Sequence, residues 1–173
     1  MKHSIILVGF MGTGKTAIGK RLASALGMRF FDSDEEIEKV TGMSIAQVYR
    51  KHGEIRLRSE ENLVIERMAK HKSCVIAMGG NFLPDLERLE YLKKNFFVIS
   101  LTARPEVIYE RVKRRNNRPT IKKKDNMDHI VQMMEERDKI YRNADFQLDT
   151  SEMDFQQIIE HILGYFRDKT KDE

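Results

Sequence analysis

The chain has 173 residues, of which 40% are hydrophobic and 34% are charged. This length suits one domain with a sizeable core, and the composition indicates a globular chain and excludes a disordered one. The formal net charge of +4 comes from 31 basic and 27 acidic residues that are interspersed, which favours a solvated surface over a nucleic-acid interface.

The single cysteine, Cys74, excludes an internal disulfide and a thiolate metal cluster. It begins the apolar run 74–77, which predicts a buried packing residue. The five histidines have no metal-binding spacing such as HExxH. The first apolar run, residues 5–8, is too short for a signal peptide or a membrane span, so we expect a cytoplasmic protein with no membrane partner.

Strand and helix patterns alternate along the chain. Short apolar runs rich in β-branched and aromatic residues predict strands at residues 4–9, 29–31, 73–78, 96–101 and 146–148. Apolar residues at helical spacing predict helices at residues 15–26, from 33 onward, 44–51, 54–70, 84–93, 105–115, 127–141 and 154–166. Ser33 and Glu36 have the spacing of a capping box. Strands separated by helices predict one α/β domain, residues 1–173, with a parallel sheet covered on both faces.

The strongest motif is a phosphate loop of the pattern G-x-x-x-x-G-K-[ST], which reads Gly9-Phe10-Met11-Gly12-Thr13-Gly14-Lys15-Thr16 here. Its glycines let backbone N–H groups wrap around phosphate oxygens. Lys15 supplies charge at the β- and γ-phosphates, and the Thr16 hydroxyl is a ligand for Mg²⁺. A predicted strand enters the motif and a predicted helix leaves it, as this mechanism requires. The motif therefore predicts a nucleotide-phosphate site.

Two acidic residues, Asp32 and Asp34, follow the second predicted strand, at the edge where parallel sheets bind ligands. Alternate residues of an extended segment point the same way, so we expect both carboxylates to face the phosphate loop. Asp32 is the best-placed carboxylate for Mg²⁺, which leaves Asp34 to accept the proton of an attacking hydroxyl. The alternative is that Asp34 only caps the following helix.

Two arginines, Arg58 and Arg137, lie beside apolar stripes on predicted helices. A charge that faces the interior needs a partner, and an ion pair of Arg58 with Glu61 explains only one of the two. Two arginines that converge on a cleft indicate an anionic substrate, with a carboxylate held by bidentate hydrogen bonds.

Two further segments fit such a site. Gly79 and Gly80 end the third predicted strand and permit a ligand to approach the backbone closely, although a double glycine is also common in turns. The basic segment of about residues 114–125 is either a solvated loop or a lid. As a lid it would exclude water and bring Arg118 to the transferring phosphoryl group.

The chain resembles the shikimate kinase family over essentially its whole length. The motifs that carry the resemblance are, in order, the phosphate loop, Asp32-Ser33-Asp34, G-E-x-x-x-R-x-x-E at 53–61, Gly79-Gly80, Arg118-Pro119, and Glu136-Arg137 with Tyr141. The resemblance implies a three-layer αβα P-loop kinase fold, with five parallel strands in the order 2-3-1-4-5. It also implies that ATP phosphorylates the 3-hydroxyl of shikimate, in aromatic amino acid biosynthesis. We expect a Mg²⁺-dependent monomer without a nucleic-acid partner.

The family's pattern also implies roles for individual residues. The catalytic residues would be Lys15, Asp34 and Arg118. The nucleotide would contact Gly12, Thr13, Gly14, Lys15, Thr16, Ala17, Arg111 and Arg118, with Arg111 stacked on adenine. Thr16 and Asp32 would hold Mg²⁺. The substrate would contact Asp34, Arg58, Gly79, Gly80 and Arg137, in a shikimate-binding region centred on residues 33–61.

The chain departs from the family's usual pattern at three pocket positions. Asn81 replaces a usual third glycine, and Tyr49 and Leu57 stand where phenylalanines usually line the substrate pocket. Tyr49 and Leu57 preserve an apolar wall, whereas Asn81 adds a side chain where the substrate approaches. The alternative functions are a kinase of another polyhydroxy acid such as gluconate, and a nucleotide-binding regulator without phosphoryl transfer.

Overall fold

The computed structural model of the chain describes residues 4–71, 73–82, 84–114 and 127–171. The strands in these ranges are β1 Ile5–Val8, β2 Arg29–Asp32, β3 Cys74–Ala77, β4 Phe97–Thr102 and β5 Phe146–Asp149. The helices are α1 Lys15–Leu26, α2 Ser33–Thr41, α3 Ile45–Ala69, α4 Leu86–Asn95, α5 Pro105–Lys113, α6 Met127–Tyr141 and α7 Phe155–Lys171. None of these helices combines the length and the apolar character that a membrane span requires.

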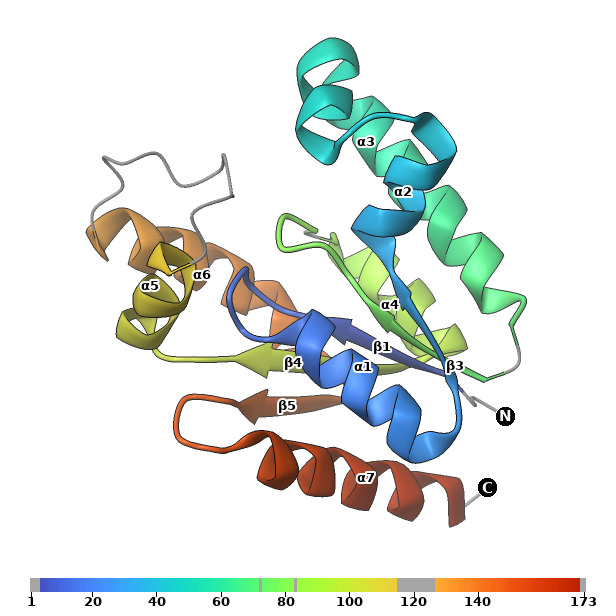
Figure 1. Ribbon diagram of the computed structural model, residues 1–173, viewed down its shortest axis with the longest axis vertical. Helices are drawn as coiled ribbons and strands as arrows, with labels where there is room; N and C mark the ends of the chain where they lie inside the picture. Colours follow the sequence, from blue (N-terminus) through green and yellow to red (C-terminus); the bar gives the residue numbers. More distant parts are fainter. Residues whose placement is uncertain (1–3, 72, 83, 115–126, 172–173) are drawn as a thin grey trace.

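The five strands form one parallel sheet in the order β2-β3-β1-β4-β5. The sheet order and the α/β class are therefore confirmed. β1 lies at the centre, where Ile5 is paired with Val75 of β3 on one side and with Phe97 of β4 on the other. Because the strands are parallel, their carboxyl ends meet at one edge of the sheet. The phosphate loop follows β1 at this edge, and Asp32 ends β2 there (Figure 1).

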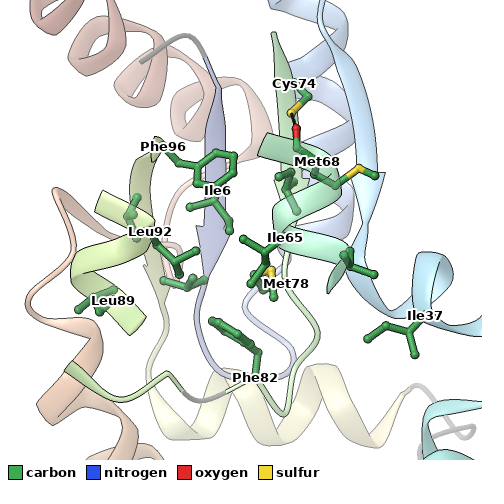
Figure 2. Close-up of a cluster of buried hydrophobic side chains, with 14 of the residues drawn as sticks. Ile6, Ile37, Ile65, Met68, Cys74, Met78, Phe82, Leu89, Leu92 and Phe96 are labelled. Carbon is green, nitrogen blue, oxygen red and sulfur yellow. Dashed lines mark hydrogen bonds between the residues drawn. The ribbon is translucent and has the colours of Figure 1, made fainter. Parts of the chain in front are cut away.

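Alternation along β1 gives the sheet one apolar core on each of its two faces. Ile6 and Val8 pack with buried residues of α3, α4 and α6, whereas Ile5 and Leu7 pack with buried residues of α1 and α7. Figure 2 shows the first core, in which Ile6 lies among apolar side chains from β3, α3 and α4. Each fully buried aliphatic side chain contributes roughly 1.5–3 kcal/mol, so the two cores hold the sheet between its helical layers.

Cys74 lies in the first core, as its apolar neighbours predict. Its side chain is fully buried, and burial raises the pKa of its thiol. The thiol contacts the Ser4 hydroxyl at 3.5 Å and the Met68 carbonyl at 3.8 Å. Cys74 is thus a packing residue.

The start of α2 differs from the prediction. The capping box expected at Ser33 and Glu36 is wrong, because Asp32 caps the helix and accepts a hydrogen bond from the Asp34 N–H at 3.1 Å. The Ser33 hydroxyl is buried and accepts instead from the Gly79 N–H at 2.9 Å. A capping box does form one helix later, at Ser44 and Gln47 of α3.

Two other helices also differ in extent. The helices predicted at 44–51 and 54–70 are the two halves of α3, which kinks at Gly53 with φ 79° and ψ −179°. This conformation is strained for residues with a side chain, so glycine marks the break. The final helix, predicted to end at residue 166, runs to Lys171, and the Thr170 hydroxyl donates to the Phe166 carbonyl at 3.0 Å.

Candidate active site

The phosphate loop between β1 and α1 folds as its motif predicts. Gly12 and Gly14 adopt positive φ angles of 81° and 95°, which turn the loop back onto the start of α1. Lys15 is buried, and its Nζ donates to the carbonyl oxygens of Gly9 at 2.8 Å and Phe10 at 2.9 Å. The positive end of α1 and the Lys15 ammonium group therefore lie at one site, which is an environment for phosphate.

The two predicted Mg²⁺ ligands lie side by side. The Thr16 hydroxyl donates to Asp32 Oδ2 at 2.8 Å, and Asp32 Oδ1 caps α2. Hydroxyl and carboxylate oxygens are the ligands that Mg²⁺ prefers. No group of three or more His, Cys, Asp or Glu side chains among the described residues forms a metal site. A pair of oxygen ligands is nevertheless what an ion shared with nucleotide phosphates requires.

Asp34 lies against Gly79, at the end of the neighbouring strand. A Cβ atom added to Gly79 would lie 2.0 Å from Asp34 Oδ1, a distance that real side chains do not reach. Gly79 is thus required by close approach of the carboxylate, and its N–H is anchored by Ser33. Asp34 belongs to the first turn of α2 and not to an extended segment as expected, yet it lines the same pocket as the phosphate loop.

One pocket of about 130 Å³ joins these groups. Its lining residues are Gly12, Gly14, Lys15, Thr16, Ala17, Asp32, Asp34, Met78, Gly79 and Gly80. Nine of these ten were predicted as site residues, and Met78 was not. Thr13 lies buried in the same loop, where its hydroxyl donates to the Phe10 carbonyl at 2.9 Å.

Arg137 of α6 reaches the same edge of the sheet. Its Nη1 donates to the Gly80 carbonyl at 2.5 Å, and its guanidinium carbon lies 5.0 Å from the centre of the Phe10 ring. Burial lowers the pKa of Arg137, and the nearby Tyr141 and Glu136 oppose this change. Tyr141 is itself buried and donates to the Phe82 carbonyl. A partly buried cation therefore lies beside Gly80.

The structure corrects the expected environment of Arg58. Its guanidinium pairs with Glu54, one turn earlier on α3, at 2.7 Å, and the side chain is 49% exposed. The alternative, an ion pair of Arg58 with Glu61, is wrong, because Glu61 pairs with Arg88 of α4 at 3.3 Å. Arg58 thus faces solvent, and its charge is already balanced without turning inward.

The remaining predicted residues are placed as follows. Arg111 of α5 donates to the Gly12 carbonyl at 3.3 Å and lies beside the phosphate loop. Arg118 and the lid predicted for about residues 114–125 lie outside the described residues, apart from Arg114. Among the positions that depart from the family pattern, Asn81 and Tyr49 are exposed and Leu57 is buried. Asn81 is not among the residues that line the pocket.

Three residues that support the site were missed by sequence reasoning. They are Ser33, Arg88 and Thr150. Ser33 holds Gly79, Arg88 pairs with Glu61, and Thr150 contacts Arg111 and the phosphate loop. Ser33 lies between the two aspartates and was interpreted only as a helix cap. The other two partners are distant in sequence, so no local spacing pointed to them.

A parallel sheet in this order, with a phosphate loop after its central strand, defines the class of the protein as a P-loop kinase. Sequence comparison narrows the class, since the family model described as shikimate kinase matches residues 11–166. The chain belongs to the shikimate kinase family.

Individual relatives agree with this family. The shikimate kinase of Pelotomaculum thermopropionicum is 43% identical over 165 residues, which cover 95% of this chain and 96% of the relative. The structure of Acinetobacter baumannii shikimate kinase in complex with shikimate is similar, with a TM-score of 0.88, 32% identity, and coverage of 98% of this chain and 95% of that chain. A gluconokinase from Sinorhizobium meliloti shares the fold alone, with a TM-score of 0.65, 17% identity, and coverage of 99% of this chain and 97% of that chain.

Proposed function

We propose that this chain transfers the γ-phosphoryl group of ATP to the 3-hydroxyl of shikimate. The observation that carries the proposal is the shared pocket, in which the phosphate loop with Lys15 faces the Asp34 carboxylate packed on Gly79. Family membership supports the choice of substrate. The anion-binding side of the pocket suits ATP, and the carboxylate side suits a hydroxyl acceptor.

The chain's own residues account for most of the proposed reaction. The loop N–H groups and Lys15 bind the phosphates, and Asp34 orients the acceptor hydroxyl in line with the γ-phosphate and accepts its proton. Catalysis then comes mainly from positioning and from neutralisation of charge on the transferring group. Arg118 belongs to this proposal as the residue that the family's pattern brings to the phosphoryl group.

Thr16 and Asp32 would hold a Mg²⁺ ion in this site. Their oxygen atoms fit the ion, and when bound it would neutralise phosphate charge. This assignment rests on the donor atoms and on the position of the pair beside Lys15 in the pocket lining.

Arg137 and Arg58 would bind the substrate carboxylate. Arg137 already lies beside Gly80, whereas Arg58 would have to leave Glu54 and turn inward when the acid binds. We expect the enzyme to act as a monomer, which its sedimentation or elution behaviour in solution tests. We expect it in the cytoplasm, where ATP is available and the buried Cys74 stays a free thiol.

The proposal is tested by ADP release from the purified protein with ATP and Mg²⁺, in the presence of shikimate, quinate, gluconate or no acceptor. Turnover that depends on shikimate supports it. Turnover only with another acid would keep the phosphate site and overturn the substrate. Binding of ATP without turnover on any acceptor would favour a nucleotide-binding regulator.

Arg137→Ala is expected to raise the KM for shikimate by about 10- to 100-fold, because charge-assisted hydrogen bonds contribute about 1.5–3 kcal/mol. The KM for ATP should stay within about twofold of the wild-type value. Steady-state kinetics with each substrate varied in turn measures both constants. The matched control is Arg142→Ala, which removes an exposed arginine directly after the end of α6. An unchanged KM for shikimate in Arg137→Ala would refute the carboxylate clamp.

A further inference from the structure

Thr150, the first residue after β5, is buried beneath the phosphate loop, with 1% of its surface exposed. Its hydroxyl oxygen lies 3.3 Å from the Thr13 carbonyl oxygen and 3.0 Å from the Thr102 carbonyl oxygen. Its backbone N–H also donates to the Thr102 carbonyl, at 2.8 Å. Thr150 therefore joins the ends of β4 and β5 to the loop that follows β1.

Arg111 of α5 binds Thr150 with both ends of its guanidinium group. Nη1 donates to the Thr150 hydroxyl at 3.1 Å, and Nη2 donates to the Thr150 carbonyl at 2.9 Å. The same Nη1 donates to the Gly12 carbonyl at 3.3 Å. The orientation of Arg111 is thus fixed by one residue of the β5–α7 loop and one residue of the phosphate loop.

A phosphate loop can direct its N–H groups at an anion only if its carbonyl groups face elsewhere. A carbonyl turned into the protein needs a donor, because leaving a buried polar group unpaired destabilises the fold. Arg111 supplies the donor for the Gly12 carbonyl. The Thr150 hydroxyl has one proton within reach of the Thr13 and Thr102 carbonyls, and we assign it to Thr13 because Thr102 already accepts the Thr150 N–H. These contacts therefore hold the loop through two of its carbonyl groups.

We propose that Thr150 is a positioning residue of the nucleotide site, which holds the phosphate loop and Arg111 in the geometry that a nucleotide requires. The inference rests on the proposed function and deepens its nucleotide site. A hydroxyl has one proton and accepts as well as donates, so Thr150 can receive Arg111 and still donate to the loop. Serine has the same hydroxyl, whereas valine has the same shape without it.

Thr150→Val keeps the shape of the side chain and removes both hydrogen bonds of the hydroxyl. We expect the Kd for ADP and the KM for ATP to rise about tenfold, because a buried hydrogen bond is lost and the Thr13 carbonyl is left unpaired. The KM for shikimate should stay within about twofold of wild type. Thr150→Ser retains the hydroxyl and should restore the Kd to within about twofold.

Two further variants separate positioning from packing. Thr102→Val makes the same chemical change at the end of β4, where the hydroxyl donates to the Leu148 carbonyl at 3.4 Å, and should leave ADP binding unchanged. Arg111→Met should weaken ADP binding, and adding Thr150→Val to it should cost less than Thr150→Val alone, because the two residues share one network. If Thr150→Val does not fold, Arg111→Met and Thr150→Ser test the same support. ADP binding should then weaken in Arg111→Met and stay near the wild-type value in Thr150→Ser.

ADP binding by calorimetry needs no acceptor, so it tests this inference apart from the substrate assignment. A wild-type protein that binds ADP but does not phosphorylate shikimate would overturn the proposed function. ADP binding by the Thr150 variants would still decide the role of Thr150. Wild-type ADP binding in Thr150→Val would overturn the role of Thr150, whatever the acceptor. Equal losses for Thr150→Val and Thr150→Ser would also overturn it, because they would reflect packing of the methyl group.

Discussion

Replacing Asp34 with asparagine is expected to lower kcat about 10³-fold, because a positioned general base contributes about 10²- to 10⁴-fold. Asparagine has the same shape but cannot take a proton from the acceptor hydroxyl. The Kd for ADP should change by less than about twofold, since Lys15 and the loop N–H groups bind the phosphates. Coupled ADP release with saturating shikimate measures kcat, and calorimetry measures the Kd for ADP.

The control for Asp34→Asn is Glu35→Gln. Glu35 is exposed in the same first turn of α2, so this change removes one negative charge from the same helix terminus without touching the pocket. It should keep kcat within about twofold of wild type. Turnover near the wild-type rate in Asp34→Asn would mean that the carboxylate neither orients the hydroxyl nor accepts its proton.

Gly79→Ala tests how Asp34 is positioned. The new Cβ would meet Asp34 Oδ1 at 2.0 Å, so the carboxylate must rotate away, whereas the backbone of Gly79 has no positive φ to strain. The fold should tolerate this change, because the end of a short side chain moves easily. We expect kcat to fall about 10²-fold and the Kd for ADP to stay within about twofold, because displacing a catalytic group by about 1 Å costs on that order.

Gly164→Ala is the matched control for Gly79→Ala, because a Cβ at Gly164 of α7 meets nothing within 4 Å. It should leave kcat unchanged. Combining Gly79→Ala with Asp34→Asn should lower kcat no further than Asp34→Asn does, since both changes remove one function. A fully additive double variant would show that Gly79 acts on the reaction independently of Asp34.

The parts of the site that are contiguous in sequence were predictable. The phosphate loop is a single eight-residue motif whose glycines, lysine and threonine act within one turn, so its pattern carries its geometry. Asp32 was also predictable, because it ends a parallel strand at the edge of the sheet where ligands bind. Asp34 lines the same pocket, but from the first turn of α2 and not from the extended segment that the prediction assumed. The sheet order came from the family resemblance, since alternating elements alone leave several parallel orders open.

The parts that depend on tertiary contacts were not predictable. Thr150 contacts Thr13 across 137 residues, and Arg88 contacts Glu61 across 27, so neither pair has a local spacing to detect. Arg58 was predicted to bind an anionic substrate, with an ion pair to Glu61, three residues away, as the alternative. The structure instead pairs Arg58 with Glu54, at the spacing of four. Helical spacing allowed both partners, and the position of α4 decided between them.

Arg88→Met is expected to lower the free energy of unfolding by about 3 kcal/mol near neutral pH, because it leaves Glu61 as an unpaired buried charge. The two side chains are only 13% and 10% exposed, and they bridge α4 and α3. The Arg88 guanidinium carbon also lies 4.6 Å from the centre of the buried Phe82 ring, and methionine replaces most of that packing. Denaturant unfolding measures the loss.

The exposed ion pair of Arg104 with Glu152 gives the control, since Arg104→Met should lower the free energy of unfolding by less than about 1 kcal/mol.

Replacing both partners should reverse the loss. Arg88 Nε and Nη2 are buried and have no hydrogen-bond partner among the described residues. Glu61 therefore satisfies only part of the hydrogen-bonding capacity of the buried guanidinium group. The double variant Glu61→Leu with Arg88→Met removes the unpaired donors of Arg88 and also the Glu61 carboxylate that Arg88→Met alone leaves without its partner. We expect its free energy of unfolding to reach or exceed the wild-type value, by about 1 kcal/mol at most, as for other buried pairs replaced by apolar residues.

The dependence of the Arg88→Met deficit on pH identifies the group responsible. Burial raises the pKa of Glu61, and the charge and hydrogen bond of Arg88 oppose that rise, so the pKa should climb further in Arg88→Met. A carboxyl group whose pKa is higher in the folded chain than in the unfolded chain contributes stability when protonated, and this contribution is lost as the pH rises through the folded-state pKa. The deficit relative to wild type should therefore be smaller near about pH 5 than near about pH 8. An equal deficit at both pH values would mean that Glu61 is not the uncompensated group and that Arg88 stabilises the fold through its packing on Phe82.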